Sequence, residues 1–364
     1  MKALAIPVPG FEDVCAAEVQ ELTGSSSTMN HGVIIFEAKT LLDICSYIYR
    51  AHTPSKVIQV LAEGSADSYK KLIDVVDWSF LSGATFVVRA DAPERQALES
   101  EIGGMIFQKT KAKVNLSHPD ITIFVLVRKE HVWIGIDLTG EELGRRAYRV
   151  FLGSEALKGN VAASLVKLSG QQQPLVDLFC RNGVIPIEAA LLAGKRSPHY
   201  FDKEEFLYRR LPVLAGTNWD AFFDKIDASV NETPQDILAM DPEFRNISAT
   251  KKNAKIAGVI KNLLFSRTDL PFLDAKFGKQ AIRTIVILPP QISGNMQKQK
   301  CELLLKDIFY QAEFVLKKGG LLAMITGTGV DALKQHANAY QFALEHERNV
   351  WQGASLLTVL LFRK

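Results

Sequence analysis

Asp177–Ala190 reads D-L-F-C-R-N-G-V-I-P-I-E-A-A, and this stretch decides the fold of the C-terminal half. Apolar residues predict a strand over 174–179, and a polar turn with one glycine then leads into an Ala- and Ile-rich helix. A strand, an acid, a glycine turn and a helix are typical of a nucleotide pocket at the mouth of a parallel sheet. Downstream, Ile285–Gly294 reads I-V-I-L-P-P-Q-I-S-G. This later strand ends in Pro-Pro, where a reactive group would face the same ligand.

The strands after residue 174 are almost continuously apolar, which indicates a parallel sheet covered by helices on both faces. We predict them at Leu175–Phe179, Ile237–Asp241, Leu263–Arg267, Thr284–Leu288 and Leu321–Thr326. A last strand over Ser355–Phe362 is expected to join the sheet in antiparallel orientation. The fold class is therefore α/β, with one sheet domain over residues 171–364.

The N-terminal half alternates short strands and helices. Residues 1–65 follow a β-α-β-α-β order, which predicts a ferredoxin-like domain with elements at Ala3–Val8, Phe11–Leu22, Gly32–Glu37, Leu41–Arg50 and Ser55–Leu61. Residues 66–150 form a second α/β unit, with helices over Tyr69–Val76 and Gln96–Lys109 and strands over Thr85–Ala90, Ile121–Arg128 and Val132–Leu138. Residues 151–170 are a linker that becomes helical near Asn160.

Composition excludes several classes of protein. No stretch approaches the roughly 20 uninterrupted apolar residues of a membrane span. The four cysteines form no C-x-x-C pair and the seven histidines show no metal-type spacing, so we expect no metal site and a cytoplasmic location. The net charge of +3 permits nucleic-acid binding without arguing for it. An aromatic insert over Ser197–Ala228 is either a base-stacking platform or, as we expect, a segment packed on the C-terminal domain.

Acidic residues follow three successive strands of the predicted sheet. Asp177 ends the first strand, Asp241 the second, and Asp269 follows the third. A carboxylate in such a position can accept ribose hydroxyl protons or an adenine amino group. Cys180 and Gly183 complete the first turn. Each acid also has a purely structural alternative, since it could cap a helix or start a turn.

Basic residues gather at two places. Lys109, Lys111 and Lys113 alternate between a helix and a strand of the middle unit, and Arg145, Arg146 and Arg149 surround Tyr148 in the following connector. Cations with an interleaved ring suit a single-stranded RNA end, because charges hold phosphates and a ring stacks on a base. The alternative is an ordinary solvated face.

Several segments together resemble one family. Asp177–Ala190 is similar to the cofactor loop D-P-x-C-G-S-G-T-x-x-I-E-A-A of the THUMP-containing RNA methyltransferases. Asp241–Val259, with Ala249, Asn253, Ala254 and Gly258, is similar to that family's next motif, and G-R-R-A-Y-R at Gly144–Arg149 resembles its R-G-Y-R linker. Lys113–Asp120 and Pro9–Val14 also resemble segments of these proteins.

The resemblance implies a ferredoxin-like domain, a THUMP domain over 66–150 and a Rossmann-fold methyltransferase domain. It implies S-adenosylmethionine as cofactor, held by Asp177, Phe179, Cys180, Gly183, Asp241 and Asp269. It further implies methylation of a guanosine N2 amine in tRNA, with the THUMP domain binding the single-stranded 3′ end of the tRNA. No membrane partner is expected.

The chain departs from this family at the fourth strand. The family has Asp or Asn, then Pro-Pro and an aromatic residue, where the first side chain accepts a proton from the target amine and the ring stacks on the base. Here the slot reads Leu288, Pro289, Pro290, Gln291, and in the cofactor loop Arg181 and Asn182 replace glycine and serine. Proper placement of reactants can account for about 7–11 kcal/mol of an activation barrier, so the loss of the side chain that orients the target amine could remove much of the catalysis.

Three hypotheses remain. The first is a working RNA methyltransferase in which Gln291 or a backbone carbonyl replaces the lost acceptor. The second is a catalytically inactive tRNA-binding paralogue that acts as a scaffold or partner subunit. The third is an unrelated nucleotide-binding α/β protein.

Overall fold

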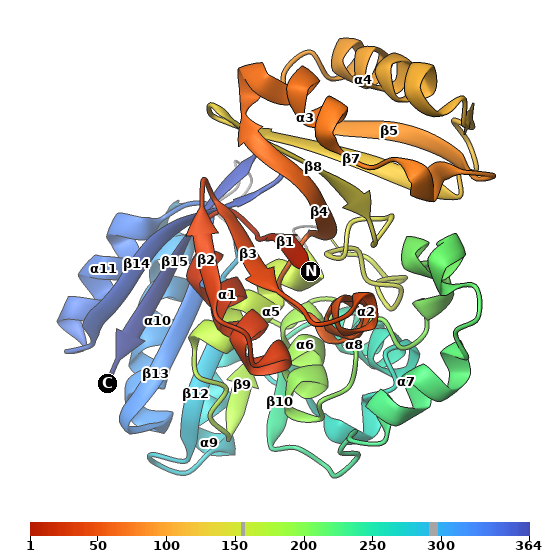
Figure 1. Ribbon diagram of the computed structural model, residues 1–364. Helices are drawn as coiled ribbons and strands as arrows, with labels where there is room; N and C mark the ends of the chain where they lie inside the picture. The colour runs from red at the N-terminus through yellow and green to blue at the C-terminus, as the bar shows by residue number, and fades with distance from the viewer. Residues whose placement is uncertain (154–156, 291–297) are drawn as a thin grey trace. The chain divides into compact units, whose positions relative to one another are not determined.

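The computed structural model describes residues 1–153, 157–290 and 298–364, and these form two compact units (Figure 1). The first unit contains most of the N-terminal half together with a later segment, and comprises Met1–Pro7, Cys15–Leu143 and Phe201–Ser229. The second unit contains the C-terminal half and a short N-terminal piece, and comprises Val8–Val14, Gly144–Tyr200 and Val230–Lys364. Among the described residues, no helix has the length and apolar character that a bilayer crossing requires.

One eight-stranded sheet runs through the first unit. Its order is β2 (Ser27–Asn30), β3 (Val33–Glu37), β1 (Lys2–Ile6), β4 (Lys56–Ser65), β8 (His131–Asp137), β7 (Ile121–Arg128), β5 (Thr85–Asp91) and β6 (Lys113–Val114). Strand β4 pairs with β1 on one side and with β8 on the other. The two predicted N-terminal units therefore share a sheet, and the predicted boundary at residue 65 is the end of β4. The short strands β2 and β6 were absent from the prediction.

Helices cover one face of this sheet, as Figure 1 shows for α1 (Glu12–Thr23), α2 (Leu41–Arg50), α3 (Tyr69–Val75) and α4 (Arg95–Thr110). Helix α2 has its predicted bounds because a capping box fixes its start. The Thr40 hydroxyl accepts from the Asp43 N–H, and the Asp43 carboxylate accepts from the Thr40 N–H. Its apolar face is buried in the core of the unit.

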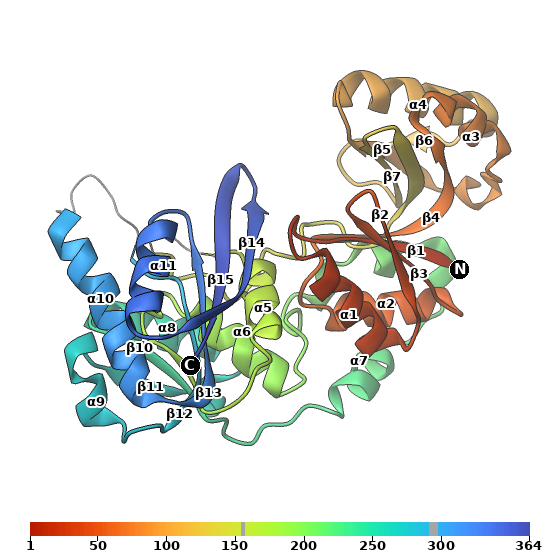
Figure 2. The same ribbon diagram turned by 90° about the vertical axis from the view of Figure 1, so that its left-hand side faces the viewer.

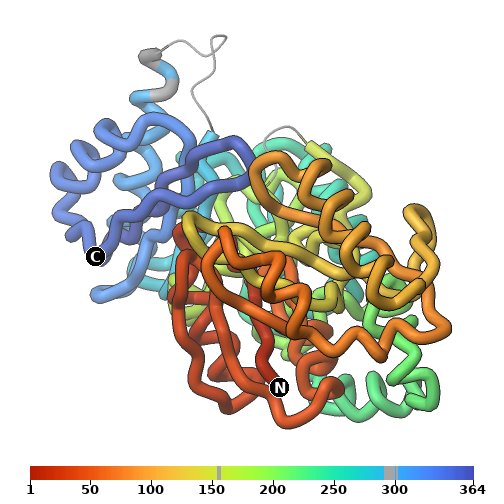
Figure 3. Tube along the Cα trace, turned by 45° about the horizontal axis from the view of Figure 1, so that its top comes forward, coloured from red at the N-terminus to blue at the C-terminus, as the bar shows by residue number. Residues whose placement is uncertain are grey.

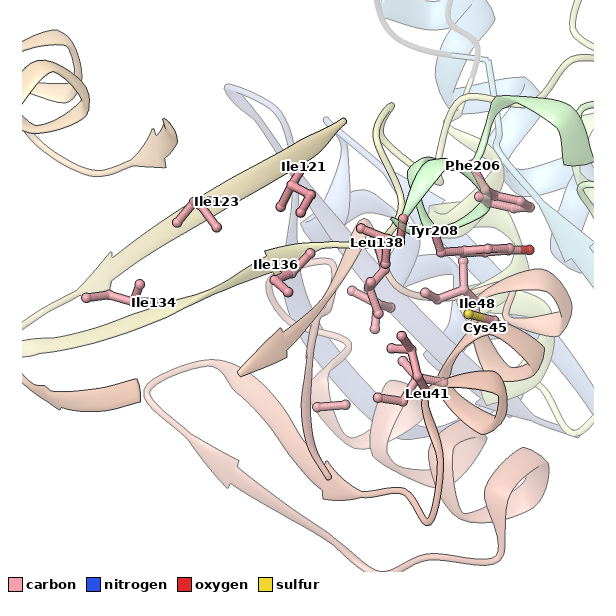
Figure 4. Packing of buried hydrophobic residues seen from close by; sticks show 14 of the residues in the cluster. Leu41, Cys45, Ile48, Ile121, Ile123, Ile134, Ile136, Leu138, Phe206 and Tyr208 are labelled. Atoms are coloured by element: carbon pink, nitrogen blue, oxygen red, sulfur yellow. The ribbon is translucent and has the colours of Figure 1, made fainter. Parts of the chain in front are cut away.

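From Phe201 onward the aromatic insert belongs to the first unit, which corrects the expectation that it packs on the C-terminal domain. The backbone of its helix α7 (Trp219–Asp227) can be followed in Figure 3. This helix contacts α2, since the Phe223 and Tyr49 ring centroids are 4.7 Å apart and the Tyr49 hydroxyl donates to Asp227. In Figure 4, Phe206 and Tyr208 lie against Cys45, Ile48 and Leu138. Their rings are buried, so they offer no stacking platform for bases.

The second unit contains a seven-stranded sheet. Its order is β11 (Leu264–Arg267), β10 (Ile237–Asp241), β9 (Leu175–Asp177), β12 (Ile282–Ile287), β13 (Leu316–Thr326), β15 (Ser355–Arg363) and β14 (Ala343–Gln352). The first five strands are parallel, and β15 is antiparallel to both of its neighbours. The predicted antiparallel last strand is confirmed, whereas β14, which is rich in charged residues, was missed.

Helices cover both faces of this sheet (Figure 2). One face packs against α5 (Gly159–Leu168), α6 (Val184–Ala193) and α8 (Phe244–Ile256), and the other against α9 (Leu273–Lys276), α10 (Lys298–Val315) and α11 (Val330–Ala339). From β9 the chain proceeds outward through β10 to β11 and then returns to place β12 on the other side of β9. The strand order therefore reverses at β9, which creates a crevice outside its carboxyl end.

Short 3₁₀ turns complete the two units. They are Ala66–Ser68, Ser79–Leu81, Lys203–Glu205, Leu207–Arg210, Pro212–Leu214, Ile260–Asn262 and Leu270–Phe272.

Candidate active site

Two buried carboxylates mark the crevice at the carboxyl edge of the second sheet. Asp177 is the last residue of β9 and Asp241 the last residue of the neighbouring strand β10. Both are almost fully buried. The turn after Asp177 lies against β10, because the Cys180 N–H donates to the Met240 carbonyl over 2.8 Å. The structure thus brings together the two acids that the sequence placed at successive strand ends.

Asp241 organises the surrounding loops. Its Oδ2 accepts from the Arg181 N–H over 2.9 Å, and its Oδ1 accepts from the Glu243 N–H and from Asn246 Nδ2, each over 2.9 Å. A carboxylate has about four acceptor positions, so three are used and one on Oδ2 remains for another donor. Asp241 therefore fixes the start of α8 and can still accept a hydroxyl proton.

Asp177 is in a different electrostatic state. Its Oδ1 accepts only from the Phe179 N–H among the described residues, over 3.1 Å. Burial raises the pKa of this carboxyl to about 8; the nearby Asp241 carboxylate adds to the rise, whereas the Phe179 N–H and the Arg181 guanidinium oppose it. Near neutral pH the Asp177 carboxyl is mostly protonated, so it can donate as well as accept a hydrogen bond.

Gly183 begins α6 in a conformation that needs glycine. Its φ is +87°, and a Cβ there would lie 2.5 Å from Thr250 Cγ2. The Thr250 side chain on α8 thus leaves no room for a Cβ at this position. Thr250 also donates to the Arg181 carbonyl over 3.0 Å, so α8 holds the turn in place.

Arg181 spans the crevice. Its φ is +51°, in the left-handed region that favours glycine, and glycine is the residue that the related cofactor loops have there. Its guanidinium Nη2 lies 3.2 Å from the Pro289 carbonyl oxygen, which accepts its hydrogen bond. The Arg181 side chain thus joins the turn after β9 to the loop after β12.

The predicted catalytic slot lies after β12. Leu288 is buried and packs in the same core as α5 and α6. Pro289 is also buried, Pro290 is half-buried, and Gln291 lies outside the described residues. A small cavity of about 20 Å³ separates Leu288 from Asp177 and Phe179, and Arg181 lines it too. A neighbouring cavity of about 300 Å³ lies between Arg181, Asn182 and the first turn of α8.

Asp269 differs from the two buried acids in its exposure to solvent. It precedes the short turn after β11, is exposed, and makes no side-chain cap to that turn. Its position at the end of the third strand agrees with the prediction, but its carboxylate is solvated, unlike those of the two buried acids.

The connector before α5 contains a buried ion pair. Arg146 Nε donates to Glu188 Oε1 over 2.8 Å, and the Tyr148 hydroxyl donates to the same oxygen over 2.8 Å. The side chains of Arg146 and Glu188 are fully buried. This contradicts the expected RNA-binding role of Arg146 and Tyr148, because neither side chain reaches the surface. Arg145 is exposed and Arg149 half-buried, so these two stay in the candidate RNA surface.

The three lysines of the middle unit lie at the end of α4 and on β6. Lys109 Nζ pairs with Asp74 over 2.9 Å, and Lys111 Nζ lies 5.7 Å from the Phe107 ring centroid. Lys109 and Lys111 line a cavity of about 570 Å³ beside Trp78, and Lys111 and Lys113 are exposed.

Asn253 is a residue whose role the sequence did not assign. Its Nδ2 donates to the carbonyls of Phe151 and Asn182, and its Oδ1 accepts from the Phe151 N–H. Asn253 therefore joins the connector to the turn before α6. The sequence signal that could have identified Asn253 is its place in the family motif that begins at Asp241.

Comparisons with known proteins agree with this architecture. Residues 146–357 match the family described as RMKL-like, methyltransferase domain, and residues 64–137 match the THUMP domain. The chain is 26% identical over 376 residues to tRNA (guanine(6)-N2)-methyltransferase of Methanocaldococcus jannaschii, which covers 96% of this chain and 97% of that protein.

Two solved structures share the fold. A possible methylase from Clostridium difficile 630 has a TM-score of 0.82 at 22% identity, over 99% of this chain and 97% of that chain. The methyltransferase SMU.472, complexed with SAH, has a TM-score of 0.78 at 19% identity, over 99% and 97% of the two chains.

Proposed function

Because the chain belongs to the RMKL-like methyltransferase domain family and carries a THUMP domain, we propose that it methylates tRNA. The methyl donor of this family is S-adenosylmethionine. The acceptor that we propose is the exocyclic N2 amine of a guanosine, as the name of the Methanocaldococcus jannaschii relative suggests. The reaction would take place in the cytoplasm, where tRNA is available.

The observation that carries this proposal is the pair of buried acids at the point where the strand order reverses. Asp241 retains an acceptor position on Oδ2, which suits a ribose hydroxyl of the cofactor. Asp177 lies beside it and is mostly protonated near neutral pH, so it adds no full negative charge to the pocket. The residues present therefore fit a nucleoside cofactor.

We assign the cofactor to the turn and strand ends already described. Asp177, Phe179, Cys180 and Gly183 would line it on the β9 side, Asp241 would hold its ribose, and Asp269 would lie toward the base. The bound cofactor supplies an electrophilic methyl group. The protein orients the target amine toward that group and excludes water from the crevice.

The catalytic slot would receive the target base at Leu288, Pro289 and Pro290. The Leu288 side chain has no acceptor for an amine proton, so a backbone carbonyl of the slot would take this role, and we assign it to Pro289. The exposed cations Lys109, Lys111, Lys113 and Arg145, together with the half-buried Arg149, would hold the phosphates of the RNA, with the 3′ end on the THUMP domain.

The proposal is tested by incubating the protein with unmodified tRNA and methyl-labelled S-adenosylmethionine, followed by digestion of the RNA to nucleosides. We expect label in N2-methylguanosine with the wild type, and none with Asp241→Ala. A wild type that binds tRNA but transfers no label would instead support the hypothesis of an inactive tRNA-binding protein.

A further inference from the structure

The cavity beside Asp177 is smaller than a nucleoside cofactor needs. The cavity that Asp177, Phe179 and Leu288 line has a volume of about 20 Å³. A water molecule occupies about 10–15 Å³ on this measure, whereas sites for small organic ligands have volumes of about 300–1,000 Å³. The residues around Asp177 therefore suit the cofactor, whereas the volume of this one cavity does not.

One side chain borders both the small cavity and the slot after β12. Arg181 lines the small cavity and also the neighbouring cavity of about 300 Å³. Its guanidinium reaches from the β9 turn to the loop after β12, where it donates to the Pro289 carbonyl. That oxygen is the backbone acceptor that we assign to an incoming amine, since the Leu288 side chain is apolar.

The backbone at Arg181 explains how this side chain comes to lie there. Its N–H donates to Asp241 and its carbonyl accepts from Thr250, so the turn is fixed from both sides. The positive φ of Arg181 is a conformation that glycine adopts without steric cost. An arginine at this point is directed across the crevice, whereas a glycine would leave the crevice open.

We propose that Arg181 occupies its own protein's cofactor pocket, so that its guanidinium must leave the Pro289 carbonyl before cofactor and target amine can bind. This inference rests on the proposed function, because it concerns the same pocket. Arg181 is thus the residue that sets cofactor affinity in this chain. Its positive charge acts in the same direction, because it repels the sulfonium of S-adenosylmethionine.

The test is the affinity for S-adenosylhomocysteine, the uncharged product of the methyl donor, measured by isothermal titration calorimetry on the full chain. Arg181→Gly and Arg181→Ala both remove the guanidinium, and the alanine variant does so without adding backbone freedom. Lys195→Gly is the matched control, because Lys195 has the same φ of +51° in the same unit and is exposed after the far end of α6. The glycine control therefore reproduces the backbone change alone.

We expect Arg181→Gly and Arg181→Ala to bind S-adenosylhomocysteine at least tenfold more tightly than the wild type, and Lys195→Gly to bind as the wild type does. Equal affinity of the wild type and both Arg181 variants would overturn this inference and leave the proposed function intact. Absence of binding by all four proteins would overturn both, since removal of Arg181 should then have opened the pocket.

Discussion

Two buried carboxylates of the second unit, Glu188 and Asp177, differ in how their charge is balanced. Glu188 on α6 accepts from the Arg146 guanidinium and from the Tyr148 hydroxyl. Asp177 is the last residue of β9, just before the turn that leads into α6. It accepts from the Phe179 N–H, and burial raises its pKa to about 8. The two acids lie in one domain and are buried to nearly the same extent.

The difference in partners distinguishes a carboxylate with a structural role from a carboxylate in a ligand-binding site. A buried carboxylate with a matched guanidinium is stable only while its partner stays, so it fixes the connector that carries Arg146 onto α6. A buried carboxylate without a full partner has a perturbed pKa, and such groups gather where ligands bind. Burial and charge alone would not have distinguished them, but their partners do.

The largest expected effect comes from breaking the paired acid. Glu188→Ala leaves the Arg146 guanidinium buried without its carboxylate, which should lower the free energy of unfolding by about 3–5 kcal/mol. Urea-induced unfolding followed by circular dichroism measures this loss.

The matched control is Glu232→Ala, because Glu232 pairs with Arg196 in the same unit but its side chain is 79% exposed. It should cost about 0–1 kcal/mol. Equal losses for the two variants would contradict the structural role of the buried pair.

A smaller effect is expected from neutralising the unpaired acid. The folded-state pKa of Asp177 is raised, so its contribution to stability is present at low pH and is lost as pH rises toward about 8. Asp177→Asn keeps an acceptor for the Phe179 N–H and removes this dependence. Relative to the variant, the wild type should lose on the order of 3 kcal/mol between pH 5 and pH 7, at about 1.4 kcal/mol per pH unit.

Urea unfolding of both proteins from pH 5 to pH 9 measures this difference. The two curves should separate steadily up to about pH 8 and run parallel above it. Parallel curves over the whole range would show that Asp177 is ionised in the folded protein, which removes the contrast with Glu188.

The smallest expected effect concerns charges that are exposed instead of buried. The double charge reversal Lys111→Glu and Lys113→Glu should weaken tRNA binding about tenfold and flatten its dependence on salt, since each lost phosphate contact removes about 0.7–0.9 from the slope. Filter binding at several salt concentrations provides both numbers.

The control for this variant is Lys317→Glu with Lys318→Glu. Both lysines are exposed near the start of β13, at the edge of the second sheet opposite the crevice, and their reversal changes the net charge equally. If both double variants weaken binding alike, the THUMP lysines bind RNA no more than other surface cations do.

The fold was predictable where local signals agreed with packing. The apolar runs of β10 and β12 located those strands, and the family and fold class are confirmed by the comparisons. Helix α2 was predicted with its observed bounds, which the capping box in the structure explains. The aromatic insert was misplaced because rings show that a segment is buried without showing against what. Strand β14 was missed because its alternation of charged residues hides its pairing with β15.

The site was predictable at Asp177 and Asp241, since acids at strand ends must meet at one edge of a parallel sheet. Arg146 and Tyr148 were wrongly assigned to the RNA surface. Their residue types do not reveal a buried partner 40 or more residues away in the sequence, which here is Glu188. The contact of Arg181 with Pro289 could not be predicted either, because it joins loops 108 residues apart.

The position at which the methyl donor binds the protein tests the account most directly. Ultraviolet cross-linking of methyl-labelled S-adenosylmethionine to the protein, followed by peptide mapping, measures this position. We predict label in the peptides that contain residues 177–183 or 241–250, and its loss when S-adenosylhomocysteine is added in excess. Label confined to the first unit, or label that excess S-adenosylhomocysteine does not displace, would contradict a cofactor site between the ends of β9 and β10.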